Sequence, residues 1–252
     1  MQLLLVRHAE SENNAKPVHN RVCDPSITAR GRLQADCLGK WMSGLAIDQL
    51  ITSPFLRTLE TTRSILQHAH APPRRYPVSV WHDVFENGGC YHGHHEKNFA
   101  GAPGLNQSAI QSFFQEIAAQ FPDRDPPPLT LDPEIDESGW WGGKDRELPE
   151  EMQARSLAVI KRFEQTFAQQ PDEEILGDRE DPVVVLIAHA DFLREMLSQM
   201  LAGRVAMDAI GPIPNTSITS LQWSTMGWKL TSLNSVTHLP PRLVTGHQAL
   251  LS

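Results

Sequence analysis

Two short apolar runs lie far apart in the chain, at residues 3–6 and 183–188, and each of them leads to a histidine. Residues 3–6 lead into Arg7 and His8, and the β-branched and apolar residues 183–188 lead into His189. Unbroken apolar runs of this length are typical of parallel strands that are buried on both faces. Such strands present functional side chains at their carboxyl ends. The sequence therefore predicts that two imidazoles meet at one edge of a parallel sheet.

Stretches with helical spacing alternate with the apolar runs. The expected helices cover residues 30–45, 54–66, 108–117, 152–167 and 192–200. On the first helix, the spacing predicts a buried face with Leu33, Cys37, Leu38, Trp41, Met42 and Leu45. Ser53 suits the N-cap and Pro54 the first helical position of the second helix. Ser108 and Gln111 form a capping-box pattern at the start of the third.

The order of these elements predicts the fold class. Residues 217–223 and 228–233, on either side of Met226-Gly227, favour a closing hairpin. Residues 87–150 are rich in Gly, Pro and His, which is typical of an insertion over a core rather than of a second domain. We expect a single α/β domain over residues 1–252. It would be a three-layer α/β/α sandwich with a mostly parallel central sheet and a capping insertion.

Composition argues against several functional classes. The 252-residue chain carries a formal net charge of −8 and has no run rich in Lys or Arg, which argues against a nucleic-acid partner. The apolar run at the amino terminus is four residues long and meets charge directly, so we expect neither a signal peptide nor a membrane span. Cys23, Cys37 and Cys90 are far apart and odd in number, which favours the reducing cytoplasm. No pattern predicts the oligomeric state.

The predicted strand ends gather positive charge. Arg7 and His8 follow one strand, His189 follows another, and Arg57 lies one helical turn beyond a third strand that ends near Ser53. If these strands are neighbours, two imidazoles and two guanidiniums meet in an acidic protein. Their natural ligand is a phosphoryl group, whose oxygens accept forked arginine hydrogen bonds and need charge neutralisation.

Five segments in order resemble the histidine phosphatase superfamily, the phosphoglycerate-mutase-like enzymes. Residues 7–14, Arg-His-Ala-Glu-Ser-Glu-Asn-Asn, resemble R-H-G-E-S-x-x-N, and residues 27–35 resemble L-T-x-x-G-x-x-Q-A. Residues 53–61 resemble S-P-x-x-R-A-x-x-T. Residues 187–190 resemble the second-histidine motif, and residues 215–218 resemble the downstream asparagine segment. Each match alone is modest evidence, but the ordered set covers the core from end to end.

The resemblance implies a role for each matched residue. His8 would be the nucleophile that becomes phosphohistidine, and Arg7, Arg57 and His189 would hold the phosphoryl oxygens with help from Asn14. The nucleophilic imidazole must be neutral, and two nearby arginines favour its neutral form. We expect His189 to be cationic and to donate to the transferring oxygens. The mechanism needs no metal or other cofactor.

The resemblance also implies an acid after the third strand that protonates the leaving oxygen. Glu86, within residues 84–89, is our candidate, and a carboxyl there would then deprotonate the attacking water. Asp83, Glu96 and Glu10 are rivals for this role. We expect Glu10 and its neighbour Ser11 to orient the loop and cap its helix.

Other notable residues have simpler interpretations. Cys90, His92, His94 and His95 are possible metal ligands, but their spacing fits no zinc template, so we predict no metal site there. A loop of polar rings near the pocket is the alternative. Trp140-Trp141 would pack in the core or the cap, and a position lining the substrate is the second possibility. We expect Asn215 to order the strand entry beneath the site.

Two departures from the family pattern bear on function. Alanine replaces glycine after both histidines, at Ala9 and Ala190, which we interpret as tolerable. Around its acid, a glycolytic phosphoglycerate mutase carries E-R-x-Y-G, with arginines that grip the substrate carboxylate. Here residues 87–93 follow Glu86 without arginine. This favours a phosphatase that acts on a sugar phosphate or similar small metabolite. A phosphoglycerate mutase and a catalytically weak phospho-ligand or partner-binding protein remain the alternatives.

Overall fold

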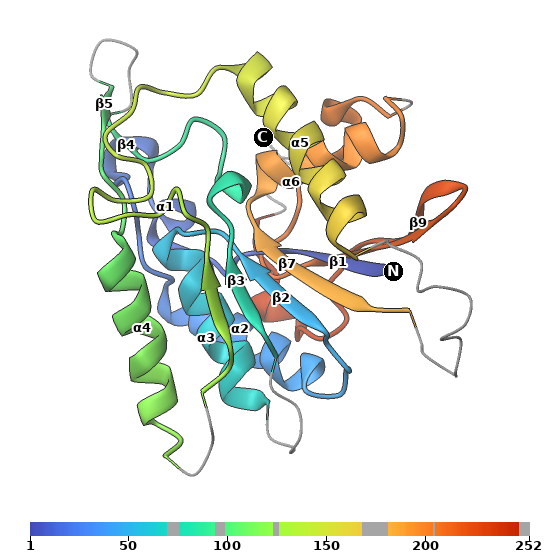
Figure 1. The fold of residues 1–252 in the computed structure, drawn as a ribbon, viewed down its shortest axis with the longest axis horizontal. Coiled ribbons are helices and arrows are strands. Elements are labelled where there is room, and N and C mark those ends of the chain that lie inside the picture. The colour runs from blue at the N-terminus through green and yellow to red at the C-terminus, as the bar shows by residue number, and fades with distance from the viewer. Residues whose placement is uncertain (70–75, 94–98, 123–125, 168–180, 204, 247–252) are drawn as a thin grey trace.

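A mostly parallel sheet of seven strands forms the centre of the molecule (Figure 1). The computed structural model describes residues 1–69, 76–93, 99–122, 126–167, 181–203 and 205–246. In the order β6-β3-β2-β7-β1-β8-β9, the strands are Leu129–Leu131, Val78–Val80, Gln49–Thr52, Val183–Ala188, Gln2–Arg7, Ile218–Ser224 and Gly227–Ser235. The first five run parallel, and β8 is antiparallel to both β1 and β9. The predicted closing hairpin is therefore confirmed.

Helices cover both faces of this sheet (Figure 1). The α-helices are α1 Glu12–Ala15, α2 Ala29–Met42, α3 Leu56–His68, α4 Gln107–Ala119, α5 Pro149–Phe167 and α6 Ala190–Met200. Short 3₁₀ helices are η1 Val18–Asn20, η2 His82–Val84, η5 Met207–Ile210 and η6 Pro241–Leu243.

Alternate residues of β1 divide the apolar core into two halves. Leu4 and Val6 pack with α2, α3 and α4 on one face. Leu3 and Leu5 pack with α5 and α6 on the other face. This division follows from the strand period of two, which sends successive side chains to opposite faces. The predicted α/β/α sandwich is confirmed.

The two apolar runs that end at histidines are adjacent strands. Leu5 of β1 lies opposite Leu186 of β7, and Arg7 lies opposite Ala188. Because the two strands are parallel and in this register, His8 and His189 leave the sheet at the same edge. The amide of His8 still donates to the Ala188 carbonyl at 2.9 Å, which extends the ladder by one residue.

The start of α3 differs from the sequence prediction. The N-cap residue is Phe55 rather than Ser53, and the helix begins at Leu56 rather than Pro54. The Ser53 hydroxyl lies 2.8 Å from Nε2 of His189, so it is engaged elsewhere. A carboxylate oxygen of Asp24 instead accepts from the Leu56 amide at 2.9 Å. An acid from a distant part of the chain therefore caps the amino-terminal end of α3, which no local sequence pattern could predict.

Two further local predictions were wrong. The capping box at Ser108 does not form, because Asn106 is the N-cap of α4 and accepts from the Ala109 amide at 2.8 Å. Ser108 instead donates to Glu137 at 2.6 Å. On α2, Leu33 and Trp41 belong to the expected apolar face, yet they are 56% and 41% exposed. Only part of that face meets the sheet.

The segment of residues 87–150 contributes to the core as well as lying beside the site. Its β6 pairs in parallel with β3 and forms one edge of the main sheet. Its α4 packs against α3, while β4 Tyr91–His92 and β5 Ala100–Gly101 form a separate two-stranded sheet. Residues 87–150 are thus tied to the sandwich at several points and supply an edge strand of its sheet.

Candidate active site

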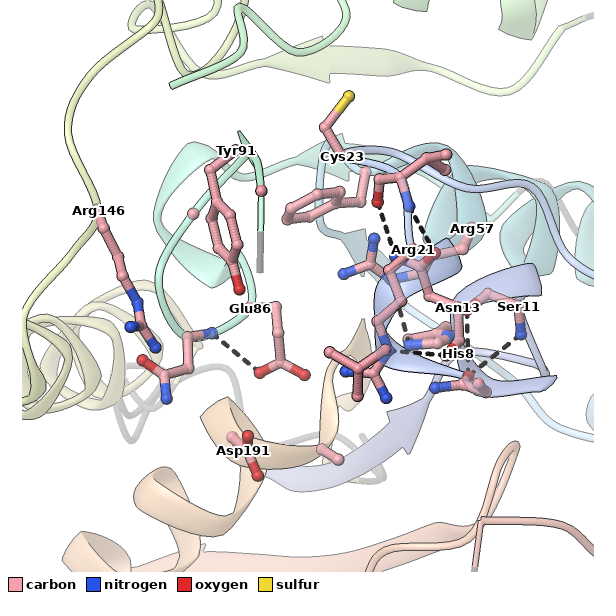
Figure 2. A pocket seen from close by; sticks show the side chains of 18 of the residues that line it. His8, Ser11, Asn13, Arg21, Cys23, Arg57, Glu86, Tyr91, Arg146 and Asp191 are labelled. Atoms are coloured by element: carbon pink, nitrogen blue, oxygen red, sulfur yellow. Dashed lines mark hydrogen bonds between the residues drawn. The ribbon is translucent and has the colours of Figure 1, made fainter. Parts of the chain in front are cut away.

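A pocket of about 660 Å³ lies at the carboxyl ends of β1 and β7 (Figure 2). Its lining includes Arg7, His8, Asn14, Arg57 and Glu86, which are five of the six residues that the sequence singles out. They come from the end of β1, from α1, from the start of α3 and from the loop after η2. Topology therefore brings together residues from distant parts of the chain.

His8 is buried, and its surroundings define its tautomer. Its Nδ1 lies 2.7 Å from the Ala9 carbonyl oxygen. A carbonyl only accepts hydrogen bonds, so the neutral ring carries its proton on Nδ1 and its lone pair on Nε2. Burial, reinforced by Arg57 and Arg7, lowers the pKa of His8 well below its ordinary value. The ring is therefore neutral at pH 7, with an unprotonated nitrogen at Nε2.

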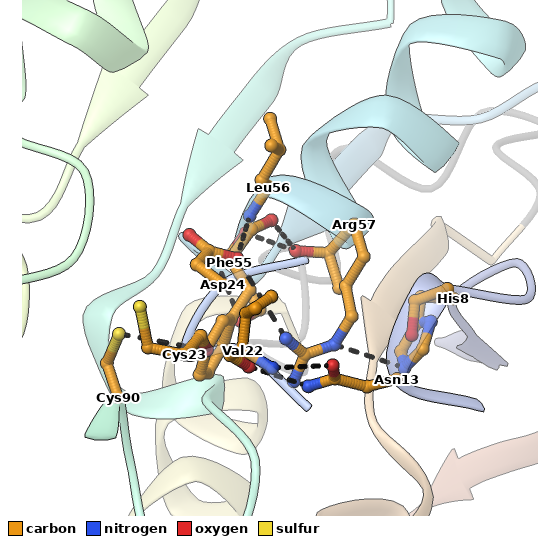
Figure 3. A network of polar contacts seen from close by, with 12 residues as sticks. His8, Asn13, Val22, Cys23, Asp24, Phe55, Leu56, Arg57 and Cys90 are labelled. Carbon is orange, nitrogen blue, oxygen red and sulfur yellow. Dashed lines mark hydrogen bonds and ion pairs between the residues drawn. The ribbon is translucent and has the colours of Figure 1, made fainter. Parts of the chain in front are cut away.

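Arg57 is the immediate neighbour of that base. Its Nε donates to Nε2 of His8 at 3.3 Å, and its guanidinium lies 3.9 Å from the centre of the Phe55 ring. Asp24 approaches from the other side, with a carboxylate oxygen 3.9 Å from Nη1 of Arg57 (Figure 3). Because one Asp24 oxygen also caps α3, the same carboxyl contacts both the helix and the arginine that the helix carries.

Arg7 and Asn14 are fixed by the segment around Asn215. Nη1 of Arg7 donates to the Ile213 carbonyl at 2.6 Å, whereas its Nε has no partner among the described residues. The Asn215 side chain donates to the His8 carbonyl at 3.0 Å and to Oδ1 of Asn14 at 3.2 Å. Asn215, expected to order the strand entry beneath the site, thus also orders the loop after β1.

His189 lies behind His8 and does not line the pocket. The two ring centres are 5.3 Å apart, and the planes meet at 61°. Nδ1 of His189 is buried without a partner in the described part of the chain. Burial, followed by the charge of Arg57, lowers the pKa of His189 well below its ordinary value. The expectation of a cationic His189 is therefore wrong for the unliganded site, where desolvation outweighs any gain from charge.

Glu86 faces the pocket from the loop after η2 (Figure 2). One carboxylate oxygen accepts from the Asn87 amide at 2.9 Å and from the Phe192 amide in the first turn of α6 at 3.2 Å. Burial and the nearby carboxylate of Asp191 raise the pKa of Glu86. A carboxyl that keeps its proton more readily than usual is suited to general-acid chemistry.

The rival acids have other surroundings. Asp83 accepts from Arg162 at 3.2 Å and Glu10 accepts from the Thr28 hydroxyl at 2.7 Å, and neither lines the pocket. Glu96 lies outside the described residues. Ser11 is the N-cap of α1 and forms a capping box with Asn14, as expected. Of the described candidates, Glu86 alone reaches the cavity.

The alanines after the histidines impose no backbone strain. Neither Ala9 nor Ala190 has a positive φ angle, so a glycine is not required at either position. Gly31 of the second matched segment is different, because a Cβ there would overlap the Glu10 carbonyl oxygen. Glycine is needed at that point for close approach between α2 and the loop after β1.

Trp140 and Trp141 pack as the simpler prediction has it. Both are buried, and neither lines the pocket. The Trp140 ring centre lies 4.6 Å from that of Phe55 and 5.7 Å from that of Phe85. Trp141 contacts Phe85 at 5.0 Å. The two indoles therefore pack between the segment of residues 87–150 and the start of α3, which carries Arg57, and the loop that carries Glu86.

The proposed ring-rich loop is only partly described. Cys90 is buried, and its thiol lies 3.9 Å from the Cys23 carbonyl oxygen, while His92 is exposed on β4. His94 and His95 lie outside the described residues. Among the residues that are described, no group of three or more His, Cys, Asp or Glu side chains is arranged to hold a metal ion.

Sequence reasoning missed four ionisable residues of this site. Asp191, Arg21 and Arg146 line the pocket, and the half-buried Asp24 lies beside Arg57. Asp191 follows a matched histidine at the start of a helix, so its position was accessible from the sequence. Asp24, Arg21 and Arg146 belong to segments without regular periodicity, and only the tertiary structure brings them to the site.

Comparison with known proteins agrees with this geometry. The family model of the histidine phosphatase superfamily (branch 1) matches residues 3–236. Phosphoserine phosphatase 1 of Hydrogenobacter thermophilus is 37% identical over 67 residues, which are 27% of this chain and 32% of that protein. A 2,3-bisphosphoglycerate-dependent phosphoglycerate mutase of Bartonella bacilliformis is 38% identical over 72 residues, 28% of this chain and 35% of that one.

The match thus spans about a third of the length of these curated relatives. The fold is shared over a longer stretch. The crystal structure of the alpha-ribazole phosphatase from Shigella flexneri superimposes with a TM-score of 0.59 at 16% identity, covering 93% of this chain and 96% of that one. In the described part of the chain, no helix is both long and apolar enough to cross a membrane. By its family match over most of its length and by its fold, the chain belongs to the histidine phosphatase superfamily.

Proposed function

We propose that this protein hydrolyses a small phosphomonoester through a phosphohistidine intermediate on His8. The observation that carries the proposal is the state of His8: a buried neutral imidazole, protonated on Nδ1, with its Nε2 lone pair beside a guanidinium. Catalysis of phosphoryl transfer depends mainly on positioning and on charge stabilisation. Both are provided by buried groups here.

In the first step, Nε2 of His8 attacks phosphorus, a nitrogen–phosphorus bond forms and the ester phosphorus–oxygen bond breaks. The phosphoryl oxygens replace His8 as acceptors from Arg57 and accept from the unpartnered Nε of Arg7. Glu86 gives its proton to the departing alkoxide. Its raised pKa keeps that proton available at a higher pH than an ordinary glutamate would.

In the second step, Glu86 acts as the base. It takes a proton from water, the water oxygen bonds to phosphorus, and the nitrogen–phosphorus bond breaks. His8 returns to its neutral state and Glu86 to its acid form, so protons balance over the cycle. His189 would assist by packing edge-on against His8, with the two ring centres 5.3 Å apart, which holds the nucleophile in place.

A hydrolase is favoured over a mutase by the segment that follows Glu86. Asn87, Gly88 and Gly89 carry no charge that holds a substrate carboxylate during return of the phosphoryl group. Its relatives include both a phosphatase and a mutase, so relatedness does not decide between the two.

Mass balance with 3-phosphoglycerate separates the candidates. Release of free phosphate supports the hydrolase, whereas isomerised product without free phosphate contradicts it and supports the mutase. A purified protein that hydrolyses no aryl phosphate between about pH 5 and 8, the range in which histidine titrates, would support a binding protein.

The composition also favours a cytoplasmic protein that acts on a small molecule. The described cysteines Cys23, Cys37 and Cys90 are free thiols, in keeping with the reducing cytoplasm. The acidic net charge favours a small-molecule substrate rather than nucleic acid.

A further inference from the structure

Two arginines line the pocket beyond those that face His8. Arg21 follows η1, and Arg146 lies in the segment before α5. Both are exposed, and neither has a carboxylate partner in the described part of the chain. The pocket volume of about 660 Å³ is also far larger than a phosphoryl group needs. For scale, one water molecule takes up about 30 Å³ in the liquid. The remaining space and charge suit the rest of a substrate.

The backbone that carries Arg146 is firmly anchored beside Glu86. The amide of the next residue, Glu147, donates to the Gly88 carbonyl at 3.3 Å. The buried Glu147 carboxylate binds Arg155 through two hydrogen bonds of 2.6 and 2.7 Å. Arg155 in turn donates to the Phe85 carbonyl at 3.1 Å. Arg146 and the catalytic acid are therefore held on one connected framework.

The Arg146 side chain lies against aromatic rings rather than an acid. Its guanidinium carbon is 4.8 Å from the centre of the Phe99 ring and 5.9 Å from that of Tyr91. Contact with π faces orients a guanidinium without using up its N–H donors. Figure 2 shows Arg146 across the pocket from His8, with Tyr91 and Glu86 between them. Its donors are therefore available at the far side of the cavity.

The other charged groups define where a second anion can bind. Asp191, in the first turn of α6, would repel an anion from that side of the pocket. Arg21 lies on the His8 side (Figure 2), where its Nε donates to the Asn13 carbonyl at 3.1 Å. The Asn13 side chain also binds the backbone of Val22, the residue after Arg21. It donates to the Val22 carbonyl at 2.7 Å and accepts from the Val22 amide at 2.9 Å. Arg146 is the cation that stands apart from the phosphoryl site.

From this arrangement we infer that Arg146 binds a second anionic group of the substrate, a carboxylate or a second phosphate. The substrate is then a phosphomonoester that carries another anion across the molecule from the group that is transferred. This inference rests on the proposed function. It also changes the comparison with mutases. Residues 87–93 lack the arginines that bind a substrate carboxylate in those enzymes, and here Arg146, from a distant segment, supplies that charge.

The test compares matched substrates that differ by one anion. Glycerol 3-phosphate and 3-phosphoglycerate share a three-carbon skeleton and differ in one carboxylate; fructose 6-phosphate and fructose 1,6-bisphosphate differ in one phosphate. We expect wild-type kcat/KM to favour the member with the second anionic group, in at least one pair, by about tenfold to a hundredfold, the range of a charge-assisted hydrogen bond. The preferred pair identifies the anion.

Variants of Arg146 assign the preference. Arg146→Gln should lower kcat/KM at least about tenfold more for the preferred substrate than for its matched partner, mainly through KM. Arg146→Lys, which keeps the charge but loses the fork, should fall between the two. Lys229→Gln removes the same charge from β9, outside the pocket, and should change neither rate.

Two outcomes overturn the inference: equal rates within both wild-type pairs, or equal losses within a pair for Arg146→Gln. Either result leaves the proposed hydrolysis intact. If no substrate is turned over, calorimetric binding of the same compounds to His8→Ala protein still decides the question. Tighter binding of the compound with the second anionic group, lost when Arg146→Gln is added, would support the subsite although the proposed function has failed. Equal affinities within both pairs would overturn it.

Discussion

At the floor of the pocket, Arg7, His8 and Arg57 are buried at the ends of regular elements, whereas at the rim Arg21 and Arg146 are exposed on irregular segments. Burial sets the protonation states of the reacting groups. It lowers the pKa of His8, which is therefore neutral, and it raises the pKa of Glu86, which faces the floor residues and keeps its proton to a higher pH. The rim is held by local contacts, such as the hydrogen bonds of Asn13 with Arg21 and Val22 and the ion pair between Glu147 and Arg155.

This contrast indicates that reaction chemistry and substrate choice are built separately. The floor needs desolvated groups with defined proton positions, and only strand and helix ends packed against a core provide them. The rim needs charges that water still reaches, so that a substrate can exchange for solvent there. Substitutions at the floor should therefore change the rate of hydrolysis of every substrate. Substitutions at the rim should change which substrates are preferred.

The largest effect is expected for His8→Ala. Loss of the nucleophile should lower kcat by at least about a thousandfold for all substrates, without loss of the fold. Phosphate release measures the rate, and intact mass after a rapid acid-free quench detects the phosphorylated wild-type enzyme. His92→Ala, an exposed histidine on β4, is the control. Residual turnover within tenfold of wild type would exclude His8 as the nucleophile.

Glu86→Gln should give the next largest effect. An alkyl leaving group needs a proton and an aryl leaving group scarcely does, so we expect a loss of about a hundredfold or more for alkyl phosphates and much less for aryl phosphates. The decline of kcat/KM at high pH, where Glu86 loses its proton, should also disappear. Glu150→Gln on α5 is the matched control. Equal losses for both kinds of substrate would show that Glu86 is not the acid.

Asp24→Asn should have the smallest effect on turnover but a distinct effect on stability. Burial raises the pKa of Asp24 from 3.8 to about 7. Between these values the folded state binds more protons than the unfolded state, so the free energy of unfolding decreases as pH rises. The asparagine variant lacks this dependence and keeps the acceptor for the Leu56 amide.

Chemical denaturation at several pH values measures the difference. Relative to Asp24→Asn, wild-type protein should lose up to about 4 kcal/mol between pH 4 and 7, since one pKa unit corresponds to about 1.4 kcal/mol. Asp208→Asn, at a fully exposed position, should show no such trend. A difference between wild type and Asp24→Asn that stays constant over this pH range would rule out the buried protonated carboxyl.

The floor was largely accessible to sequence reasoning, and the rim was not. Arg7, His8 and His189 follow apolar runs whose length and composition indicate buried parallel strands, and strand ends are a general location for function. Arg146 has no such context, because its relation to Glu86 depends on the long-range bond between Glu147 and Gly88. The sequence also could not show that Asp24 replaces Ser53 at the start of α3, because both residues have suitable side chains.

Charge states were harder to predict than positions. The expectation of a cationic His189 considered only the anion that the site would bind. In the folded protein the ring is fully buried among cations, and desolvation decides its state. Similar reasoning from neighbours succeeded for His8, because burial and the adjacent arginines act in the same direction there.

The indoles of Trp140 and Trp141 rest directly on glycine backbone. A Cβ at Gly104 would overlap the ring of Trp140, and one at Gly89 would overlap the ring of Trp141; both glycines also have positive φ angles. During divergence, these four positions are expected to change together or not at all. New substrate preferences would then arise by exchange of single side chains such as Arg146. The packing of Trp140 and Trp141 on the two glycines would stay the same in related enzymes.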